Sequence, residues 1–145
     1  PPPYLLPFQI QSVQANGWCL QDNGSDGVAF TICDWSDPSK VWLWLAGNDN
    51  SYLMRSQIQN YKTERGLNSD GVDNHQITMG ACNPQTAYNQ WDMHRQDNGA
   101  TYFESMANTD LNCINITNAG GYVHNWKECT DNNNSLWITQ IPPTS

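Results

Sequence analysis

The sequence predicts an all-β domain built from three copies of one four-stranded unit. Each copy has a turn rich in Asn, Asp and Gly, then a cysteine, then a tryptophan eight or nine residues further on. The tryptophans that close the copies are Trp42, Trp91 and Trp137, which lie 49 and 46 residues apart. A repeat of this length decides the fold, because each copy must bury its hydrophobic face against its neighbours.

Short apolar stretches separated by turn residues support this fold class. In the first copy we expect strands at residues 8–13, 18–20, 28–33 and 41–45, with turns at 16–17 and 22–27. Four short strands with turn signals every 8 to 12 residues are typical of all-β proteins. The second copy repeats the scheme with strands at 52–56, 58–65, around 67, at 77–79 and at 91–93. The third does so from Tyr102-Phe103 to Ile138.

The length of 145 residues is that of one domain with a core of its own. Residues 1–7 form a proline-rich lead-in, which we expect to be extended and which fits the end of a linker from a preceding domain. Residues 8–145 form the domain, and its copies cover approximately 8–47, 48–97 and 98–141.

Composition and charge exclude two classes of partner. The net charge is −8 and the chain has six Lys and Arg residues, scattered singly, so no basic patch for nucleic acid is expected. No apolar run approaches the roughly 20 residues that span a bilayer, so no membrane insertion is expected.

The five cysteines follow the copies. Cys19 and Cys33 flank one turn, Cys113 and Cys129 flank the equivalent turn of the third copy, and Cys82 has no counterpart in its own copy. This pattern predicts two local disulfides and one free thiol in a secreted protein. The alternative is five buried thiols in a cytosolic protein. No C-x-x-C or H-x-x-x-H spacing occurs, so no metal and no cofactor are expected.

Three copies closed by x-x-Trp, two of them with a cysteine pair around the central turn, resemble the ricin B-chain type β-trefoil. This is a family of lectins and carbohydrate-binding modules, and the resemblance extends over residues 8–141. It implies a barrel of six strands capped by three hairpins in a pseudo-threefold arrangement, with the closing tryptophans in the core. The family's Q-x-W signature is degenerate, because Lys40, Asn89 and Ser135 stand where the glutamine is expected.

The resemblance places a sugar site in the third copy. A sugar ring needs hydrogen-bond partners for its hydroxyls and an aromatic ring for its apolar face. The family's site positions correspond to Asn115, Trp126 and Asn134, with His124 nearby. Asn115 replaces the usual Asp, and Trp126 is one residue away from the usual aromatic position. Because a shift of one residue turns a strand side chain to the opposite face, Trp126 could face either the cleft or the core.

The other two copies offer less complete sets. In the first, Asp22 and Trp35 could form a rearranged site, although Gln21 holds the family's acidic position; the alternative is turn capping by Asp22 and a surface tryptophan. In the second, Asn68 and Asn89 are candidates, but Gly80 stands where the stacking ring should be, and Tyr88 could substitute for it.

The sequence therefore predicts a secreted lectin or targeting module for glycans of the galactose or N-acetylgalactosamine type, without catalysis. Its histidines and glutamates are scattered, and no nucleophile and base stand together, so no catalytic residues are expected. The alternative is a trefoil that has lost sugar binding and acts through protein–protein contacts, as a toxin adaptor subunit or a protease inhibitor. The degenerate signature favours the alternative, and the third-copy set favours the lectin.

Overall fold

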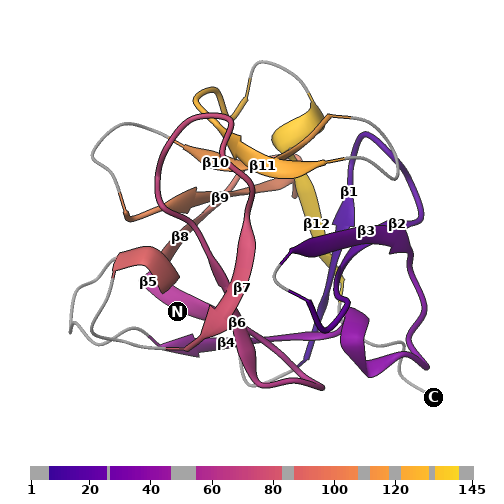
Figure 1. The fold of residues 1–145 in the computed structure, drawn as a ribbon. Helices are drawn as coiled ribbons and strands as arrows, with labels where there is room; N and C mark the ends of the chain where they lie inside the picture. The colour runs from indigo at the N-terminus through magenta and orange to yellow at the C-terminus, as the bar shows by residue number, and fades with distance from the viewer. Residues whose placement is uncertain are drawn as a thin grey trace.

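The computed structural model describes residues 7–25, 27–46, 55–82, 87–107, 112–117, 122–130 and 133–140. Within these ranges the regular structure consists of strands and three single-turn 3-10 helices (Figure 1). The strands are β1 (Gln9–Ser12), β2 (Trp18–Asp22), β3 (Val28–Ile32), β4 (Trp42–Ala46), β5 (Arg55–Asn60), β6 (Arg65–Asn68), β7 (Thr78–Ala81), β8 (Trp91–Arg95), β9 (Thr101–Ser105), β10 (Cys113–Ile116), β11 (Val123–Trp126) and β12 (Trp137–Gln140). The 3-10 helices are η1 (Pro38–Lys40), η2 (Ala87–Asn89) and η3 (Asn133–Ser135), each just before a closing tryptophan.

Six strands form a closed barrel. Strand β1 pairs with β12, β12 with β9, β9 with β8, β8 with β5, and β5 with β4, all antiparallel. The ring is completed where Phe8 and Trp42 exchange two backbone hydrogen bonds of 2.9 and 2.8 Å. Closure leaves no long unpaired edge in the barrel, which removes a surface on which other chains could pair.

Three hairpins complete the copies, namely β2–β3, β6–β7 and β10–β11. Figure 1 shows them as separate sectors in indigo, magenta and orange. Isolated bridges join Gly27 to Thr78 and Gln76 to His124, so each of these contacts links neighbouring hairpins. The result is the expected arrangement of three four-stranded copies.

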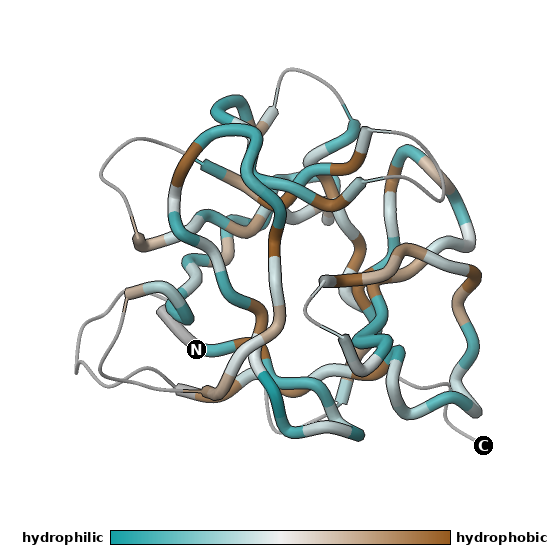
Figure 2. The backbone as a smooth tube through the Cα atoms, in the orientation of Figure 1, coloured by the Kyte–Doolittle hydropathy of each residue, from teal (hydrophilic) through white to brown (hydrophobic). Residues whose placement is uncertain are grey.

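The closing tryptophans occupy equivalent places in the core. Trp42, Trp91 and Trp137 are fully buried, which confirms their predicted position. Each indole Nε1 donates to a backbone carbonyl of the hairpin in its own copy, at 3.0 to 3.1 Å. These acceptors are Leu20, Leu67 and Ile114. Figure 2 shows hydrophobic segments along the strands and hydrophilic ones in the turns between them.

The predicted strand at residues 58–65 is wrong. Strand β5 ends at Asn60, and a turn follows before β6 begins at Arg65. The Asn60 side chain makes this turn, because its Oδ1 accepts from the backbone N–H groups of Lys62 and Thr63 at 3.0 and 3.2 Å. Glu64 then takes a positive φ of 62°. Asparagine commonly forms such turns through its side chain. The predicted strand at 52–56 lies partly outside the described residues.

The cysteine prediction is confirmed. Cys19 is bonded to Cys33 and Cys113 to Cys129, while Cys82 is free. No helix in the described part of the chain has the length and apolarity needed to cross a bilayer.

The second copy keeps the geometry of the missing bridge. Gly66 stands at the position of Cys19 and Cys113, and a Cβ placed on it would lie 2.7 Å from the Cys82 sulfur. The thiol therefore fills the space that the first cysteine takes in the other copies. Burial raises the pKa of Cys82 to about 11, so the thiol stays protonated at neutral pH.

Candidate functional site

One position of each hairpin contacts the 3-10 turn of its own copy. Gln21 Nε2 donates to Ser39 Oγ at 2.8 Å, Asn89 Nδ2 donates to Asn68 Oδ1 at 2.8 Å, and Asn115 Nδ2 donates to Ser135 Oγ at 2.7 Å. Asn89 and Ser135 occupy two of the degenerate signature positions. In the second and third copies, a polar side chain at the signature position therefore makes the contact between hairpin and turn.

The predicted third-copy residues come together around a hollow of about 290 Å³. We call it the third-copy hollow. It is lined by the four predicted residues Asn115, His124, Trp126 and Asn134, together with Asn74 and Thr117. Strands β10 and β11 supply three of the predicted residues, and η3 supplies the fourth.

The hydrogen bonds of Ser135 fix the orientation of the Asn115 amide. The Ser135 hydroxyl donates its proton to the Glu128 carbonyl at 3.1 Å, so its oxygen must accept from Asn115. Asn115 therefore turns its Nδ2 toward Ser135 and keeps its Oδ1 as an acceptor. Asn115 is 4% exposed, so this acceptor is held in place by packing as well as by the hydrogen bond.

His124 supplies a second acceptor. Its Nδ1 lies 3.0 Å from the Asn125 carbonyl oxygen, which can only accept, so Nδ1 carries the proton. Burial lowers the pKa of His124 below the ordinary value of 6.5, against smaller raising effects of the Asn125 carbonyl and the Asp73 charge. The neutral ring presents Nε2 as an acceptor, 3.3 Å from the Thr117 hydroxyl.

Trp126 faces the hollow and not the core. Asn115 pairs directly with His124 in the β10–β11 ladder, and Trp126 follows two residues later on the same face of β11. The Trp126 ring is half-buried and meets the His124 ring edge-on, with centroids 5.9 Å apart. Tyr122 stacks on the other side of this aromatic group, 5.0 Å from His124.

A loop of the second copy completes the hollow. Asn74, at a positive φ of 69°, donates its backbone N–H to the Asn125 carbonyl, and its own carbonyl accepts from the Tyr122 hydroxyl at 3.0 Å. The fully buried Asn125 side chain fixes the same loop by donating to the carbonyls of Val72 and His75, both at 3.2 Å. The hollow therefore lies where two copies meet.

Sequence reasoning missed Asn74 and Thr117. Thr117 lies two residues after Asn115, so strand alternation alone could have placed the two on one face. Asn74 belongs to another copy, and nothing in the sequence indicates that its loop packs against β11.

The structure does not bring the two candidates of the first copy, Asp22 and Trp35, together in one hollow. Asp22 is 2% exposed, and its carboxylate accepts from Arg65, from the Thr63 hydroxyl and from the Gly24 backbone N–H. Burial alone would raise the pKa of Asp22, but these hydrogen bonds outweigh it and lower the pKa. Asp22 follows Gln21 by one residue and so points to the opposite face. Trp35 lines a separate apolar hollow with Pro7, Pro38 and Tyr61.

The two candidates of the second copy, Asn68 and Asn89, lie together, but they are hydrogen-bonded to each other. The Asn68 Oδ1 accepts from Asn89, so one of the two lone pairs that Asn115 keeps available is already engaged in Asn68. Asn89 is 2% exposed. Gly80 lies beside Asn68 and has no ring, while Tyr88 is half exposed in the turn.

Comparisons with known proteins agree with this architecture. The matched structures include a GlcNAcα1-4Gal-releasing endo-β-galactosidase from Clostridium perfringens, at 17% identity and a TM-score of 0.76 over 96% of this chain and 33% of that one. They also include the Polyporus squamosus lectin bound to Neu5Acα2-6Galβ1-4GlcNAc, at 15% identity and a TM-score of 0.76 over 93% of this chain and 48% of that one. A third is the BEL β-trefoil, at 12% identity and a TM-score of 0.77 over 97% of this chain and 96% of that one.

The fold is a β-trefoil. The expected β-trefoil fold is thereby confirmed, and identities of 12 to 17% show the fold alone. The trefoil spans about a third of the matched endo-β-galactosidase and nearly all of the BEL protein. No protein-family model matches the sequence, and no curated protein matches it.

Proposed function

We propose that this trefoil is a carbohydrate-binding protein or targeting module and that the third-copy hollow is its sugar site. The observation that carries the proposal is the convergence of two fixed acceptors with an aromatic ring in one shallow hollow. Asn115 Oδ1 can accept from a sugar hydroxyl, His124 Nε2 can do so when a sugar hydroxyl takes the place of the Thr117 hydroxyl 3.3 Å away, and Trp126 offers a face for ring C–H groups. A few polar groups that fix orientation beside an aromatic surface are typical of small-molecule sites.

Galactose-type glycans are the proposed ligands, including N-acetylgalactosamine. The ring of galactose has an apolar face that stacks on an aromatic side chain, and its hydroxyls supply donors for the two acceptors. Two of the similar structures support this choice, because one is named as an endo-β-galactosidase that releases GlcNAcα1-4Gal and the other holds a galactose-containing trisaccharide.

We further propose binding without catalysis. Hydrolysis of a glycosidic bond commonly uses two carboxyl groups about 5 to 10 Å apart. The six side chains that line the third-copy hollow include no carboxylate. The two disulfides support secretion, since such bonds persist in oxidising compartments.

A glycan array tests the proposal, with wild-type protein and the Trp126→Ala variant side by side. We expect wild-type signal on galactose-terminated glycans and loss of that signal in the variant. A flat array, together with tight binding to a protein, would favour the alternative of a trefoil that acts through protein contacts.

Asn115→Ala is expected to weaken glycan binding by about 1–3 kcal/mol, or roughly 5- to 150-fold in Kd, because sugar hydroxyls lose a fixed acceptor. Asn68→Ala is the matched control, since Asn68 holds the same place in the second copy and its Oδ1 already accepts from Asn89. Calorimetric titration of both variants with the glycan found on the array decides the matter. Equal losses in the two variants would move the site away from the third copy.

Binding should also depend on pH through His124. Its lowered pKa keeps Nε2 unprotonated at neutral pH, so affinity should stay constant from pH 8 to about 6.5 and fall only below that. The free energy of unfolding should also fall below about pH 6.5. The reason is that His124 takes up its proton at a higher pH in the unfolded chain than in the folded protein. Titrations at pH 8, 7, 6 and 5 measure this, and His124→Gln should give a flat profile. A loss of affinity already between pH 8 and 7 would contradict this role.

A further inference from the structure

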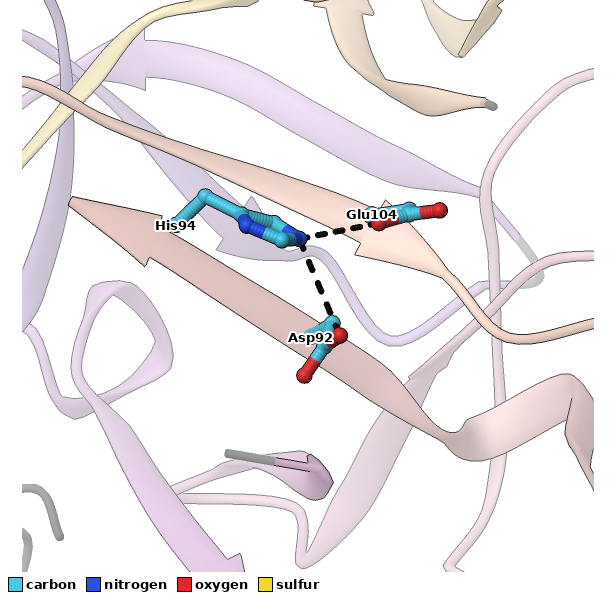
Figure 3. Close-up of side chains that lie close together, drawn as sticks. All are labelled: Asp92, His94 and Glu104. Atoms are coloured by element: carbon cyan, nitrogen blue, oxygen red, sulfur yellow. Dashed lines mark hydrogen bonds and ion pairs between the residues drawn. The ribbon is translucent and has the colours of Figure 1, made fainter. Parts of the chain in front are cut away.

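Three potential metal ligands lie together on the β8–β9 ladder, apart from the third-copy hollow. His94 Nε2 is 2.8 Å from Glu104 Oε1 and 3.7 Å from Asp92 Oδ2 (Figure 3). All three ligand atoms lie within 4.8 Å of one another. The side chains of Asp92 and Glu104 are only 13% and 19% exposed, and that of His94 is 38% exposed.

The register of the two strands explains why these residues meet. Asp92 pairs directly with Glu104, and His94 pairs with Tyr102. Asp92 and His94 are two residues apart on β8, as Tyr102 and Glu104 are on β9, so all four side chains share one face. The His94 ring stacks on Tyr102, with centroids 4.6 Å apart and planes 13° apart. This stacking holds the imidazole so that its Nε2 points toward the carboxylates (Figure 3).

The pairing brings two carboxylates face to face in a partly buried place. Like charges directly opposite each other on neighbouring strands destabilise a sheet. The net charge of the chain is −8, so its overall field adds to this repulsion. Such a pair is stabilised when a positive charge lies between the two groups.

We propose that Asp92, His94 and Glu104 form a binding site for a divalent transition-metal ion, with Zn²⁺ as the ion to test. Zn²⁺ takes His nitrogen and Asp or Glu oxygen as ligands, with bonds of about 2.0–2.2 Å. Two ligand atoms on one tetrahedral ion are therefore roughly 3.4 Å apart. The 3.7 Å between His94 and Asp92 is close to this separation, and the 2.8 Å between His94 and Glu104 must widen slightly to admit the ion. Small rotations of the carboxylates bring the third pair into range, and a neutral imidazole with two carboxylates balances the charge of the ion.

The donor set favours a transition metal over Mg²⁺ or Ca²⁺. Those two ions prefer oxygen ligands alone and six or more of them, whereas an imidazole nitrogen favours zinc, copper, nickel or iron. Three protein ligands leave at least one position of the ion for water. Reading the chain for metal-ligand spacings along the sequence misses this site, because Glu104 is brought to Asp92 by strand pairing.

The ion would join the second copy to the third. Strand β8 closes the second copy and β9 opens the third, so bound metal would fasten the two at their boundary in the barrel. An ion that binds the folded protein and not the unfolded chain raises the melting temperature with its concentration.

Calorimetric and thermal-shift titrations with ZnCl₂ test the site, on protein first stripped with EDTA. We expect one Zn²⁺ per chain and a melting temperature that rises with Zn²⁺, while equal concentrations of MgCl₂ give no rise. His94→Gln should lose both effects. His75→Gln is the matched control, because His75 also contacts a carboxylate, that of Asp70 at 2.6 Å, and this variant should bind Zn²⁺ as the wild type does.

Glu104→Gln separates metal binding from folding. It removes one ligand and also the repulsion with Asp92, so the metal-free variant should melt no lower than the wild type while its response to Zn²⁺ is lost. The proposal is overturned if Zn²⁺ leaves the melting temperature of the wild type unchanged. That result is expected if His94 only forms an ion pair with the carboxylates. It is also overturned if His94→Gln or Glu104→Gln binds Zn²⁺ as the wild type does, or if His75→Gln abolishes binding.

Discussion

Trp137→Ala is expected to destabilise the protein by about 3–5 kcal/mol, as truncation of a buried aromatic does. The side chain is fully buried, its Nε1 donates to the Ile114 carbonyl at 3.0 Å, and the Phe30 ring meets it edge-on at 6.0 Å. The substitution leaves a cavity and an unpaired carbonyl. Thermal unfolding measures the loss, at about 2–4 °C of melting temperature per kcal/mol for a chain of this size.

Trp126→Ala is the matched comparison, because it removes the same side chain from a half-buried position on the hollow. We expect a loss of about 1 kcal/mol or less in stability, together with loss of glycan binding. Equal stability losses in the two variants would show that Trp126 belongs to the core and would remove the aromatic surface from the proposed site.

Gly66→Cys is expected to form a third disulfide with Cys82 and to stabilise the protein by about 3 kcal/mol, the chain-entropy gain for a loop of roughly 15 residues. A Cβ on Gly66 would lie 2.7 Å from the Cys82 sulfur. That is too close for unbonded side chains but near the Cβ-to-sulfur separation across a disulfide, roughly 3 Å. The new bridge would repeat the ones in the first and third copies.

The double variant Gly66→Cys, Cys82→Ala serves as the control, since it carries the new side chain without a bonding partner. Mass spectrometry of the oxidised protein should show no free thiol in the single variant, which should melt higher than the double variant. Two free thiols in the single variant would mean that the second copy does not share the backbone geometry of the others.

The fold could be predicted because its signals are local and repeated. Trp42, Trp91 and Trp137 recur at nearly constant spacing, and the cysteine pairs recur with two of them, so an error in one copy is corrected by the others. The second copy shows the limit of this reasoning. There the strand ends at Asn60, whose side chain accepts hydrogen bonds from the backbone of the following turn. The alternation of hydrophobic and polar residues does not reveal such a turn.

The site could be predicted only where its residues share a hairpin. Asn115, His124 and Trp126 lie on adjacent paired strands, so their proximity follows from the hairpin itself. Asp22 lies at a buried position, one residue of register away from the strand face that carries Gln21. Asn74 and Glu104 reach their neighbours through contacts between copies, and such contacts depend on the packing of the whole barrel.

An NMR titration with a galactose-terminated glycan tests the central claim most directly, by following the indole N–H signals of the tryptophans. The account predicts that the Trp126 signal shifts in a saturable way. Trp42, Trp91 and Trp137 should stay unchanged, because their N–H groups are buried and bonded to backbone carbonyls. A shift of Trp35 in place of Trp126, or no shift of any indole with a glycan that binds, would contradict the assignment of the sugar site to the third-copy hollow.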